Sequence, residues 1–223
     1  LIIRSERELR GQIWEWRGFG KSIAFVPTMG ALHEGHMSLV RLAGMHAHKT
    51  VASIYVNPTQ FAPGEDFEAY PRDEDDDVAK LAAAGCDMVY IPPAGSMYGP
   101  RNATSIKVGG VGDGLETNHR PTFFEGVALV VTKLLNRVAP DVAVFGEKDY
   151  QQLATIRRLV SDLDMPIEIV GAPIARDEAG LALSSRNQYF DADGLAIARN
   201  LNVIMRACAK QLQMGHDVGF ATG

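Results

Sequence analysis

The chain has 223 residues, of which 46% are hydrophobic and 22% are charged. That is enough for one large domain or a domain and a half, with an ordinary globular composition. A net charge of -5 argues against general nucleic-acid binding, which needs a basic face. No apolar run approaches the roughly 18 residues of a membrane span, and the first residues lack the order of a signal peptide. We therefore expect a cytoplasmic protein that binds neither nucleic acid nor a membrane.

The first third of the chain alternates helical and strand patterns. An amphipathic helix is expected over 5–18, because its apolar residues recur at helical spacing. The apolar run 23–26 is expected to be a buried strand that Pro27 ends, since proline has no N–H for a strand ladder. A helix over 38–48 should follow, with two exposed histidines in its last turn.

The same patterns continue to residue 213. Strands are predicted at 50–56, 88–91, 142–145 and 167–170, and helices at 73–84, 124–138, from the turn at 146–152 to 163, and at 192–213. Residues 106–108 are expected to form a short edge strand, and 216–223 no completed element. The alternation predicts an α/β fold with a Rossmann-like, doubly wound parallel sheet. The alternation ends near 172–180, where we place a domain boundary.

A glycine-containing turn after the first strand carries His33 and His36. Gly30 and Gly35 allow a tight turn and close approach to a ligand. The N-terminus of the following helix suits a phosphate, and histidines there can donate hydrogen bonds or transfer protons. A metal site is disfavoured, because the spacing differs from the zinc protease motif and no third ligand is evident. The turn taken alone fits a phosphate site and a structural loop equally well.

Polar side chains follow the second strand and open the next helix. Asn57 and Gln60 stand at the strand's carboxyl end, where ligands of open parallel sheets bind. Turn chemistry alone explains Asn57, but it explains little about Gln60. The acidic run Asp73–Asp77 opens a helix, where carboxylates are favourable without any ligand. A contribution of this run to magnesium binding is the alternative.

Two later turns also carry groups that suit phosphates. Lys148 and Asp149 follow a strand, with Gln152 one helical turn further on. A cation there can bind phosphate and a carboxylate can accept from ribose hydroxyls. The alternative is a helix start with a surface Lys–Asp pair. A third loop, 184–186, offers two serine hydroxyls and an arginine, which suit polyphosphate, although a helix cap would look similar.

The three turns together predict a reaction more specifically than any one of them alone. None supplies an activated protein nucleophile, because no Gly-x-Ser-x-Gly elbow is present and no cysteine is suitably placed. The two cysteines, Cys86 and Cys208, form neither a disulfide framework nor a metal pattern. The combination indicates attack on a nucleotide α-phosphate with pyrophosphate leaving, catalysed mainly by positioning and charge stabilisation.

Five segments together carry a family resemblance. They are Pro27–His36, Asn57–Phe61, Arg120–Thr122, Phe145–Gln152 and Gly180–Asn187. In this order and spacing the chain resembles the pantothenate synthetase (pantoate–β-alanine ligase) family, whose members are nucleotidyltransferases with a His-x-Gly-His-type motif. The resemblance implies condensation of D-pantoate with β-alanine, using ATP and Mg²⁺, through a pantoyl adenylate. It also implies release of AMP and pyrophosphate, and a homodimer.

The resemblance assigns roles to matching positions. It implies an ATP site formed by Met29, Gly30, Ala31, Leu32, His33, Glu34, Gly35, His36, Gly146, Glu147, Lys148, Asp149, Ala175, Leu183, Ser184, Ser185 and Arg186. It implies catalytic roles for His33, His36, Lys148 and Arg186. Pantoate would bind Gln60 and Gln152, and β-alanine would also bind Gln60.

Two positions depart from the family pattern. Phe123 stands where some relatives have a histidine, so a polar role is absent there. Lys80 stands where some relatives have glutamine, which weakens the transfer of metal ligation to Asp76 and Asp77.

The resemblance also implies a domain organisation. Residues 1–175 would form the Rossmann-like nucleotide- and pantoate-binding domain, and 176–223 the start of a smaller C-terminal α/β lid domain that is incomplete here. Two other functions stay open. One is a nucleotidyltransferase acting on a phosphorylated alcohol, which would not require Gln60 and Gln152. The other is a nucleotide-binding regulator without catalysis, against which the intact histidine, lysine and arginine residues argue.

Overall fold

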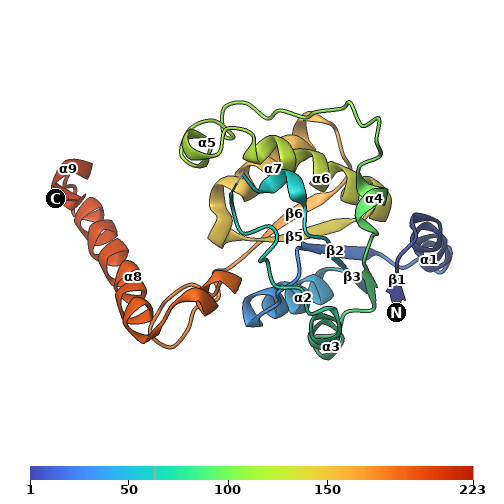
Figure 1. Cartoon of the computed structure of the whole chain (residues 1–223), viewed down its shortest axis with the longest axis horizontal. Coiled ribbons are helices and arrows are strands. Elements are labelled where there is room, and N and C mark those ends of the chain that lie inside the picture. Colours follow the sequence, from blue (N-terminus) through green and yellow to red (C-terminus); the bar gives the residue numbers. More distant parts are fainter. Residues whose placement is uncertain (63, 223) are drawn as a thin grey trace. The chain divides into compact units, whose positions relative to one another are not determined.

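The computed structural model describes residues 1–62 and 64–222. Its strands form one parallel sheet in the order β1-β4-β3-β2-β5-β6 (Figure 1). The strands are β1 (Ile2–Ile3), β2 (Ile23–Thr28), β3 (Lys49–Ile54), β4 (Met88–Tyr90), β5 (Val142–Gly146) and β6 (Glu168–Ala172). This architecture confirms the predicted α/β class with a doubly wound parallel sheet.

Helices connect and follow the strands. The α-helices are α1 (Glu6–Gly18), α2 (Glu34–His46), α3 (Glu74–Ala83), α4 (Ala94–Met97), α5 (Glu116–His119), α6 (Phe123–Val138), α7 (Tyr150–Asp162), α8 (Ala192–Gln213) and α9 (Val218–Thr222). Short 3-10 turns are η1 (Pro58–Gln60), η2 (Glu147–Asp149) and η3 (Ser185–Tyr189). No helix in the described part of the chain is long and apolar enough to cross a membrane.

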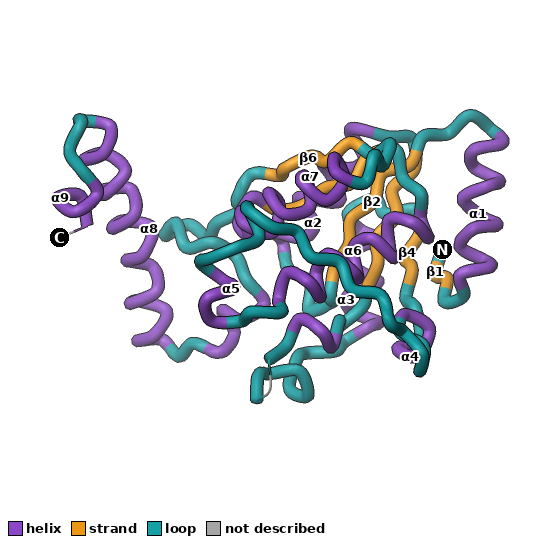
Figure 2. The backbone as a smooth tube through the Cα atoms, turned by 90° about the horizontal axis from the view of Figure 1, so that it is seen from above, coloured by secondary structure: helices purple, strands orange, loops and turns teal. Residues whose placement is uncertain are grey.

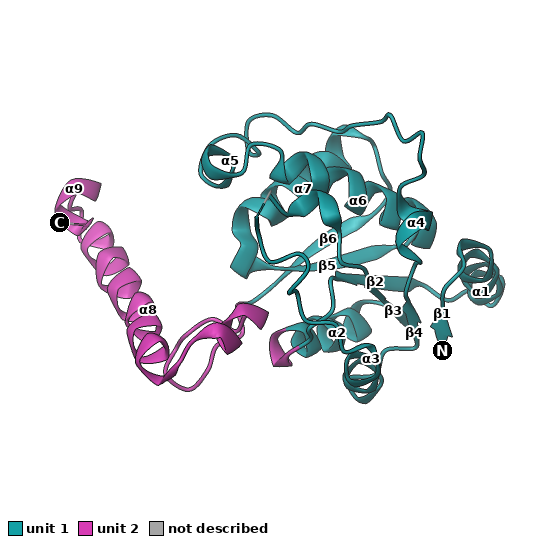
Figure 3. Ribbon diagram, viewed as in Figure 1, with its two compact units in different colours: residues 1–32, 36–173 teal, residues 33–35, 174–223 magenta. Residues whose placement is uncertain are grey.

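The chain divides into two compact units, coloured separately in Figure 3. Unit 1 comprises Leu1–Leu32 and His36–Pro173 and contains the whole sheet. Unit 2 comprises His33–Gly35 and Ile174–Gly223, and holds η3, α8 and α9. The assignment of the second unit to a lid domain stays a prediction.

Alternate residues of the central strands pack on opposite faces of the sheet in unit 1, where helices flank the strands (Figure 2). Ile23 and Phe25 join α1, α6 and α7 in one core cluster, whereas Ala24 and Val26 join α2 and α3 in the other. This period of two is the normal consequence of the strand pleat. Both faces are buried, which explains why the strands read as continuous apolar runs.

The prediction that Pro27 ends the first strand is wrong. β2 continues through Pro27, which lies opposite Ser53 of β3. Successive residues of a strand direct their polar backbone groups to opposite sides, and Ile23 O accepts from Asp141 N on the β5 side. By this alternation Pro27 also faces the β5 side, but pairing with β5 has ended at Phe25. The missing N–H therefore costs no ladder bond.

Other element boundaries also differ from the predictions. The second helix begins at Glu34 instead of residue 38 and ends at His46, so His48 lies outside it and contacts Ser22 through Nδ1. Residues 106–108 do not form a strand, and Val218–Thr222 form the unpredicted helix α9. The two-residue strand β1, also unpredicted, pairs with β4.

The long helix α8 presents apolar side chains to solvent. Apolar residues at helical spacing in 201–212 predict a face buried in a core or an interface. None of the residues of α8 is buried, however, and Leu201 and Ile204 are more than half exposed. The core interpretation is therefore wrong for the part of the chain that the structure describes.

Gly126 tests how closely α6 packs against the η1 turn. A Cβ on Gly126 would lie 2.5 Å from Thr59 O and 2.6 Å from Thr59 Oγ1. We expect Gly126→Ala to lower the free energy of unfolding by about 1–3 kcal/mol, the usual cost of overpacking. Urea-induced unfolding followed by circular dichroism would measure the change.

The matched control is Gly11→Ala in α1, where a Cβ would meet no heavy atom within 4 Å. This variant should gain about 0.5–1 kcal/mol, because alanine is the better helix former. If Gly126→Ala were as stable as the parent, the close contact between α6 and η1 would be contradicted.

Candidate functional site

The strand order of unit 1 places three polar segments at one edge of the sheet. β2 lies between β3 and β5, so the chain moves outward from β2 in one direction through β3 and β4 and in the other through β5 and β6. Because these strands are parallel, their carboxyl ends lie at the same edge. Ligands of doubly wound sheets bind at this edge, where the strand order reverses.

The segments that leave this edge are those singled out in the sequence. Met29–Leu32 follow β2, the η1 turn with Gln60 follows β3, and the η2 turn with Lys148 follows β5. The fold thus brings together at one edge three of the regions predicted to bind ATP and pantoate. Which atoms bind which ligand stays a prediction.

His36 and His33 lie on either side of the start of α2. His36 is in the first helical turn, within unit 1, and is half-buried. His33 precedes the helix, and its Nδ1 accepts a hydrogen bond from Gly35 N at 3.1 Å. This bond leaves the proton of a neutral His33 on Nε2. An added Cβ on Gly35 would lie 2.8 Å from the His33 ring, so a larger residue at position 35 would displace the imidazole.

Asp77 is almost completely buried, at 2% exposed, and contacts the loop after β2. Its Oδ2 accepts from Ala31 N at 2.9 Å and its Oδ1 from Leu32 N at 2.7 Å. Burial raises the pKa of Asp77, and these two backbone donors oppose that rise. The local sequence pattern predicts Asp77 to be a helix-start carboxylate or a metal ligand. It gives no sign of a contact with a loop 45 residues earlier.

The predicted metal ligands are therefore engaged with protein groups. Asp76 pairs with Lys80 at 2.6 Å, and both oxygens of Asp77 accept backbone N–H groups. Among the residues that the structure describes, no group of three or more His, Cys, Asp or Glu side chains could hold a metal ion. Metal ligation by Asp76 and Asp77 stays a prediction.

Asn57 orients the side chain of Gln60. Asn57 is 1% exposed, and its Nδ2 donates to Gln60 Oε1 at 2.9 Å and to Gly126 O at 3.3 Å. Its Oδ1 accepts from the hydroxyl of Tyr98 at 2.9 Å. With Oε1 bound to Asn57, the Nε2 donors are the part of Gln60 that can bind a substrate oxygen.

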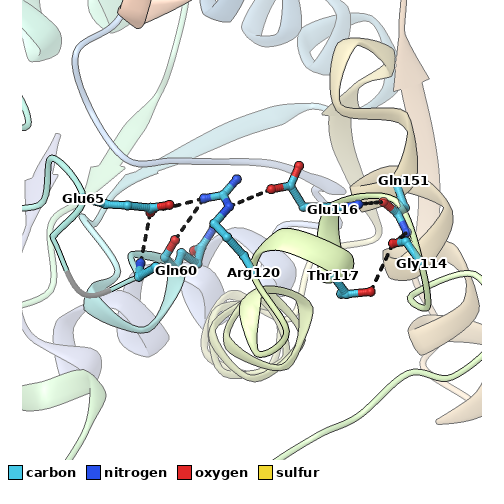
Figure 4. Close-up of polar contacts among 8 residues, drawn as sticks. Gln60, Glu65, Gly114, Glu116, Thr117, Arg120 and Gln151 are labelled. Atoms are coloured by element: carbon cyan, nitrogen blue, oxygen red, sulfur yellow. Dashed lines mark hydrogen bonds and ion pairs between the residues drawn. The ribbon is translucent and has the colours of Figure 1, made fainter.

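Arg120 connects the segment after Gln60 to α5 (Figure 4). Its Nε donates to Glu116 Oε1 at 2.6 Å, and its Nη1 lies 3.4 Å from both Gln60 O and Glu65 Oε2. The guanidinium also stacks over the Phe123 ring, with 4.0 Å from Cζ to the centroid. The aromatic face of Phe123 therefore contacts the arginine.

Gln151 anchors the glycine-rich segment before α5 (Figure 4). Its Oε1 accepts from Glu116 N at 3.2 Å, and its Nε2 donates to the carbonyls of Val111 and Gly114. The adjacent Gln152, predicted to bind pantoate, is half-buried. The side-chain amide of Gln151 is thus already bound to the backbone of another segment, and Gln152 is the glutamine of this pair that is predicted to bind a substrate.

Lys148 and Asp149 are exposed in the η2 turn. Their charged atoms lie 3.2 Å apart, and the side chains are 38% and 60% exposed. An exposed pair of this kind contributes less than about 1 kcal/mol to stability. Both groups can therefore exchange this contact for a ligand at little cost.

In unit 2 the predicted ATP-binding residues lie on a loop closed by backbone contacts. Leu183 N donates to Ala175 O at 2.9 Å, so these two predicted residues are neighbours. Ser184 precedes η3, and its Oγ accepts from Arg186 N at 3.3 Å, which is the capping geometry weighed as an alternative. Asp177 accepts from Leu181 N and from Arg199 of α8, which fixes the loop to the helix.

Comparison with known proteins identifies relatives over almost the entire chain. The family model described as pantoate-beta-alanine ligase matches residues 1–220. A curated pantothenate synthetase from Mesorhizobium japonicum is 54% identical over 222 residues, which is 100% of this chain and 78% of the relative. One from Rhodospirillum rubrum is 56% identical over 97% of this chain and 77% of the relative.

Solved structures agree with these matches. The pantothenate synthetase of Thermus thermophilus superposes with a TM-score of 0.92 at 42% identity, covering 99% of this chain and 78% of that chain. The pantoate-beta-alanine ligase of Francisella tularensis, which is complexed with β-γ ATP and β-alanine, gives a TM-score of 0.86 at 35% identity, covering 92% of this chain and 79% of that chain. Sequence, family model and fold thus agree: the chain belongs to the pantoate–β-alanine ligase family.

Proposed function

We propose that the chain catalyses the ATP-dependent condensation of D-pantoate with β-alanine through a pantoyl adenylate, using the residues that unit 1 gathers at the carboxyl edge of its sheet. The observation that carries this proposal is the position of Met29–Leu32, Gln60 and Lys148 after three adjacent parallel strands. The Francisella tularensis relative that binds β-γ ATP and β-alanine supports two of the three substrates.

In the first step, a carboxylate oxygen of pantoate attacks the α-phosphorus of ATP. A P–O bond forms to the pantoate, the bond to the bridging oxygen breaks, and pyrophosphate leaves with the electron pair. We assign stabilisation of the phosphates to His36 and Lys148, with Lys148 as a positive charge. Asp149 is assigned to the ribose hydroxyls. The substrate itself supplies the nucleophile, so the enzyme's task is to position it.

In the second step, the amine of β-alanine attacks the acyl carbon of the adenylate. An amide bond forms, the bond to the AMP oxygen breaks, and the amine loses a proton. We assign Gln60 to both pantoate and β-alanine, because its Oε1 accepts from the buried Asn57 and its Nε2 donors suit substrate oxygens. Gln152 is assigned to pantoate alone. The loop of unit 2 is assigned to ATP through Ala175 and the segment from Leu183 to Arg186, with Arg186 binding phosphate.

Magnesium enters this proposal with the nucleotide. Mg²⁺ is usually held by substrate phosphates together with only one or two carboxylates. Asp76 and Asp77 fit poorly as those carboxylates, because one pairs with Lys80 and the other accepts two backbone N–H groups. We assign the cation to the phosphates of ATP.

We also propose a cytoplasmic homodimer. Light scattering at two protein concentrations would test the dimer.

The adenylation step can be tested before β-alanine is added. We expect pyrophosphate to be released from ATP and Mg²⁺ when D-pantoate is present and not when it is absent, because the carboxylate is the nucleophile. A coupled phosphate assay after pyrophosphatase treatment would measure it. Release with a phosphorylated alcohol in place of pantoate would favour a nucleotidyltransferase, and ATP binding without any release would favour a regulator.

Lys148→Ala should slow pantoate-dependent pyrophosphate release by about 10²–10³-fold, since a charge facing the transition state is lost. Thermal unfolding should change little, because the lysine makes only an exposed pair. The matched control is Lys21→Ala, which removes an exposed lysine from the loop before β2. Equal turnover of Lys148→Ala and the parent would remove Lys148 from the mechanism.

Gln60 variants test whether Gln60 contributes to the binding of pantoate and not to the binding of ATP. Gln60→Ala should raise the KM for pantoate by about 10–100-fold, the cost of a hydrogen bond to a charged group, while the KM for ATP stays near that of the parent. Gln60→Glu should be at least as damaging, because a carboxylate repels pantoate. Steady-state kinetics with each substrate varied in turn would show this. A collapse of ATP affinity in either variant would contradict the assignment.

A further inference from the structure

The loop that follows β2 is held by side chains from a helix far along the chain. Asp77, in the first half of α3, accepts hydrogen bonds from two consecutive backbone N–H groups, at 2.9 Å from Ala31 and 2.7 Å from Leu32. Hydrogen bonds to an ionised carboxylate are stronger than neutral ones. Both oxygens of a buried carboxylate are thus committed to this loop.

Lys80 binds a carbonyl of the same backbone segment. Its Nζ donates to Leu32 O at 2.9 Å and pairs with Asp76 Oδ2 at 2.6 Å. Asp77 and Lys80 are three residues apart on α3, so they project from the same face of the helix. The N–H and the C=O of Leu32 are therefore both bound by α3.

The backbone of this loop needs external support. Ala31 has φ of 51° and Gly30 has φ of 83°, and the left-handed region is disfavoured for a residue with a Cβ. The Asp77 carboxylate also fills the space beside Gly30, where an added Cβ would lie 2.9 Å from Oδ2. The glycine and the carboxylate are fitted to each other.

Asp77 is not the residue that caps its own helix. Asp73 is the residue that caps α3, because its side chain accepts from Asp76 N at 3.1 Å. The carboxylate of Asp77 instead bonds the Ala31–Leu32 backbone, immediately before the start of α2 and its His36. A contact of this kind sets the direction in which the loop presents its backbone and the first turn of α2.

We infer that Asp77, assisted by Lys80, is a positioning residue that holds the Met29–Leu32 loop in the conformation that receives the phosphates of ATP. The inference rests on the proposed function, together with the role in ATP binding that the family resemblance implies for this loop. In this role neither side chain contacts a substrate. Loss of the hydrogen bonds from Asp77 and Lys80 to this loop should therefore weaken ATP binding while leaving the pantoate contacts of Gln60 and Gln152 in place.

The first test is Asp77→Asn, which nearly preserves shape but turns one acceptor into an NH₂ group facing a backbone donor. We expect the dissociation constant of an ATP analogue with a non-hydrolysable β–γ link to rise at least about tenfold, as measured by calorimetry. The KM for ATP should rise similarly, and the KM for pantoate should stay within about twofold of the parent value. The matched control is Asp75→Asn, an exposed carboxylate in the first turn of the same helix, which should change neither constant.

The second test avoids the buried carboxylate, in case Asp77→Asn does not fold. Lys80→Met keeps the aliphatic stem but loses the ammonium, and should raise the analogue's dissociation constant about threefold. Lys80→Arg should restore most of the affinity, because it returns a cation that can reach the Leu32 carbonyl. A structural defect alone would lower ATP and pantoate affinities together.

The outcomes separate the inference from the proposed function. Unchanged analogue affinity in a folded Asp77→Asn or Lys80→Met protein would overturn the inference, and so would parallel loss of both substrates. If the parent binds the analogue but releases no pyrophosphate with pantoate, the proposed reaction fails. The comparison of analogue affinity between the parent and the variants still tests the role of Asp77 and Lys80. If the parent does not bind the analogue, both are overturned.

Discussion

The parallel pairing of β2 with β3 on one side and with β5 on the other determines where the segments of unit 1 that are predicted to bind ligands begin. Parallel strands carry their connections at the same two edges, so the segments after β2, β3 and β5 leave the sheet side by side. An antiparallel partner in either position would send its segment to the opposite edge. The buried apolar residues on both faces hold this arrangement rigid, which allows the polar segments at the edge to be irregular.

Those irregular segments are kept in place by buried and partly buried polar side chains rather than by regular structure. Asp77 binds the segment after β2, Asn57 binds the one after β3, and Arg120 joins the latter to α5. A buried carboxylate or amide without partners would cost several kcal/mol, so each of these groups has its geometry fixed by its hydrogen bonds. The groups that remain exposed, such as Lys148 and Asp149, can then change partners when a ligand binds.

This division suits a reaction in which the substrates supply the reacting groups. Pantoate brings the nucleophile and ATP brings the leaving group, so the protein needs donors, a positive charge and a fixed geometry. In the proposed function, Lys148, His36 and the Nε2 of Gln60 meet the first two requirements, and the hydrogen bonds that hold the segments after β2 and β3 meet the third. The absence of an activated serine or cysteine motif in the sequence is the expected counterpart of this chemistry.

The sequence by itself determined the central strands, most of the helices and the three polar turns, because apolar periodicity and glycine or proline punctuation are local properties. It also indicated Gln60 and Lys148 as candidate ligand-binding residues, and each lies in the first 3-10 turn after a strand. It failed at Pro27, because whether a proline ends a strand depends on where the neighbouring strand stops pairing. It missed β1, which at two residues has too little pattern to be recognised and depends on its pairing with β4.

Only the tertiary structure decided the roles of Asp77, Asn57, Arg120 and Gln151. Each contacts a segment distant in the sequence, and a carboxylate at a helix start looks the same whether it faces water or a loop. The partners of a buried polar group are chosen by the packing of whole elements, here α3 against the loop after β2 and α6 against η1. Local sequence carries the chemical type of such a side chain, and only the fold supplies the atoms that satisfy it.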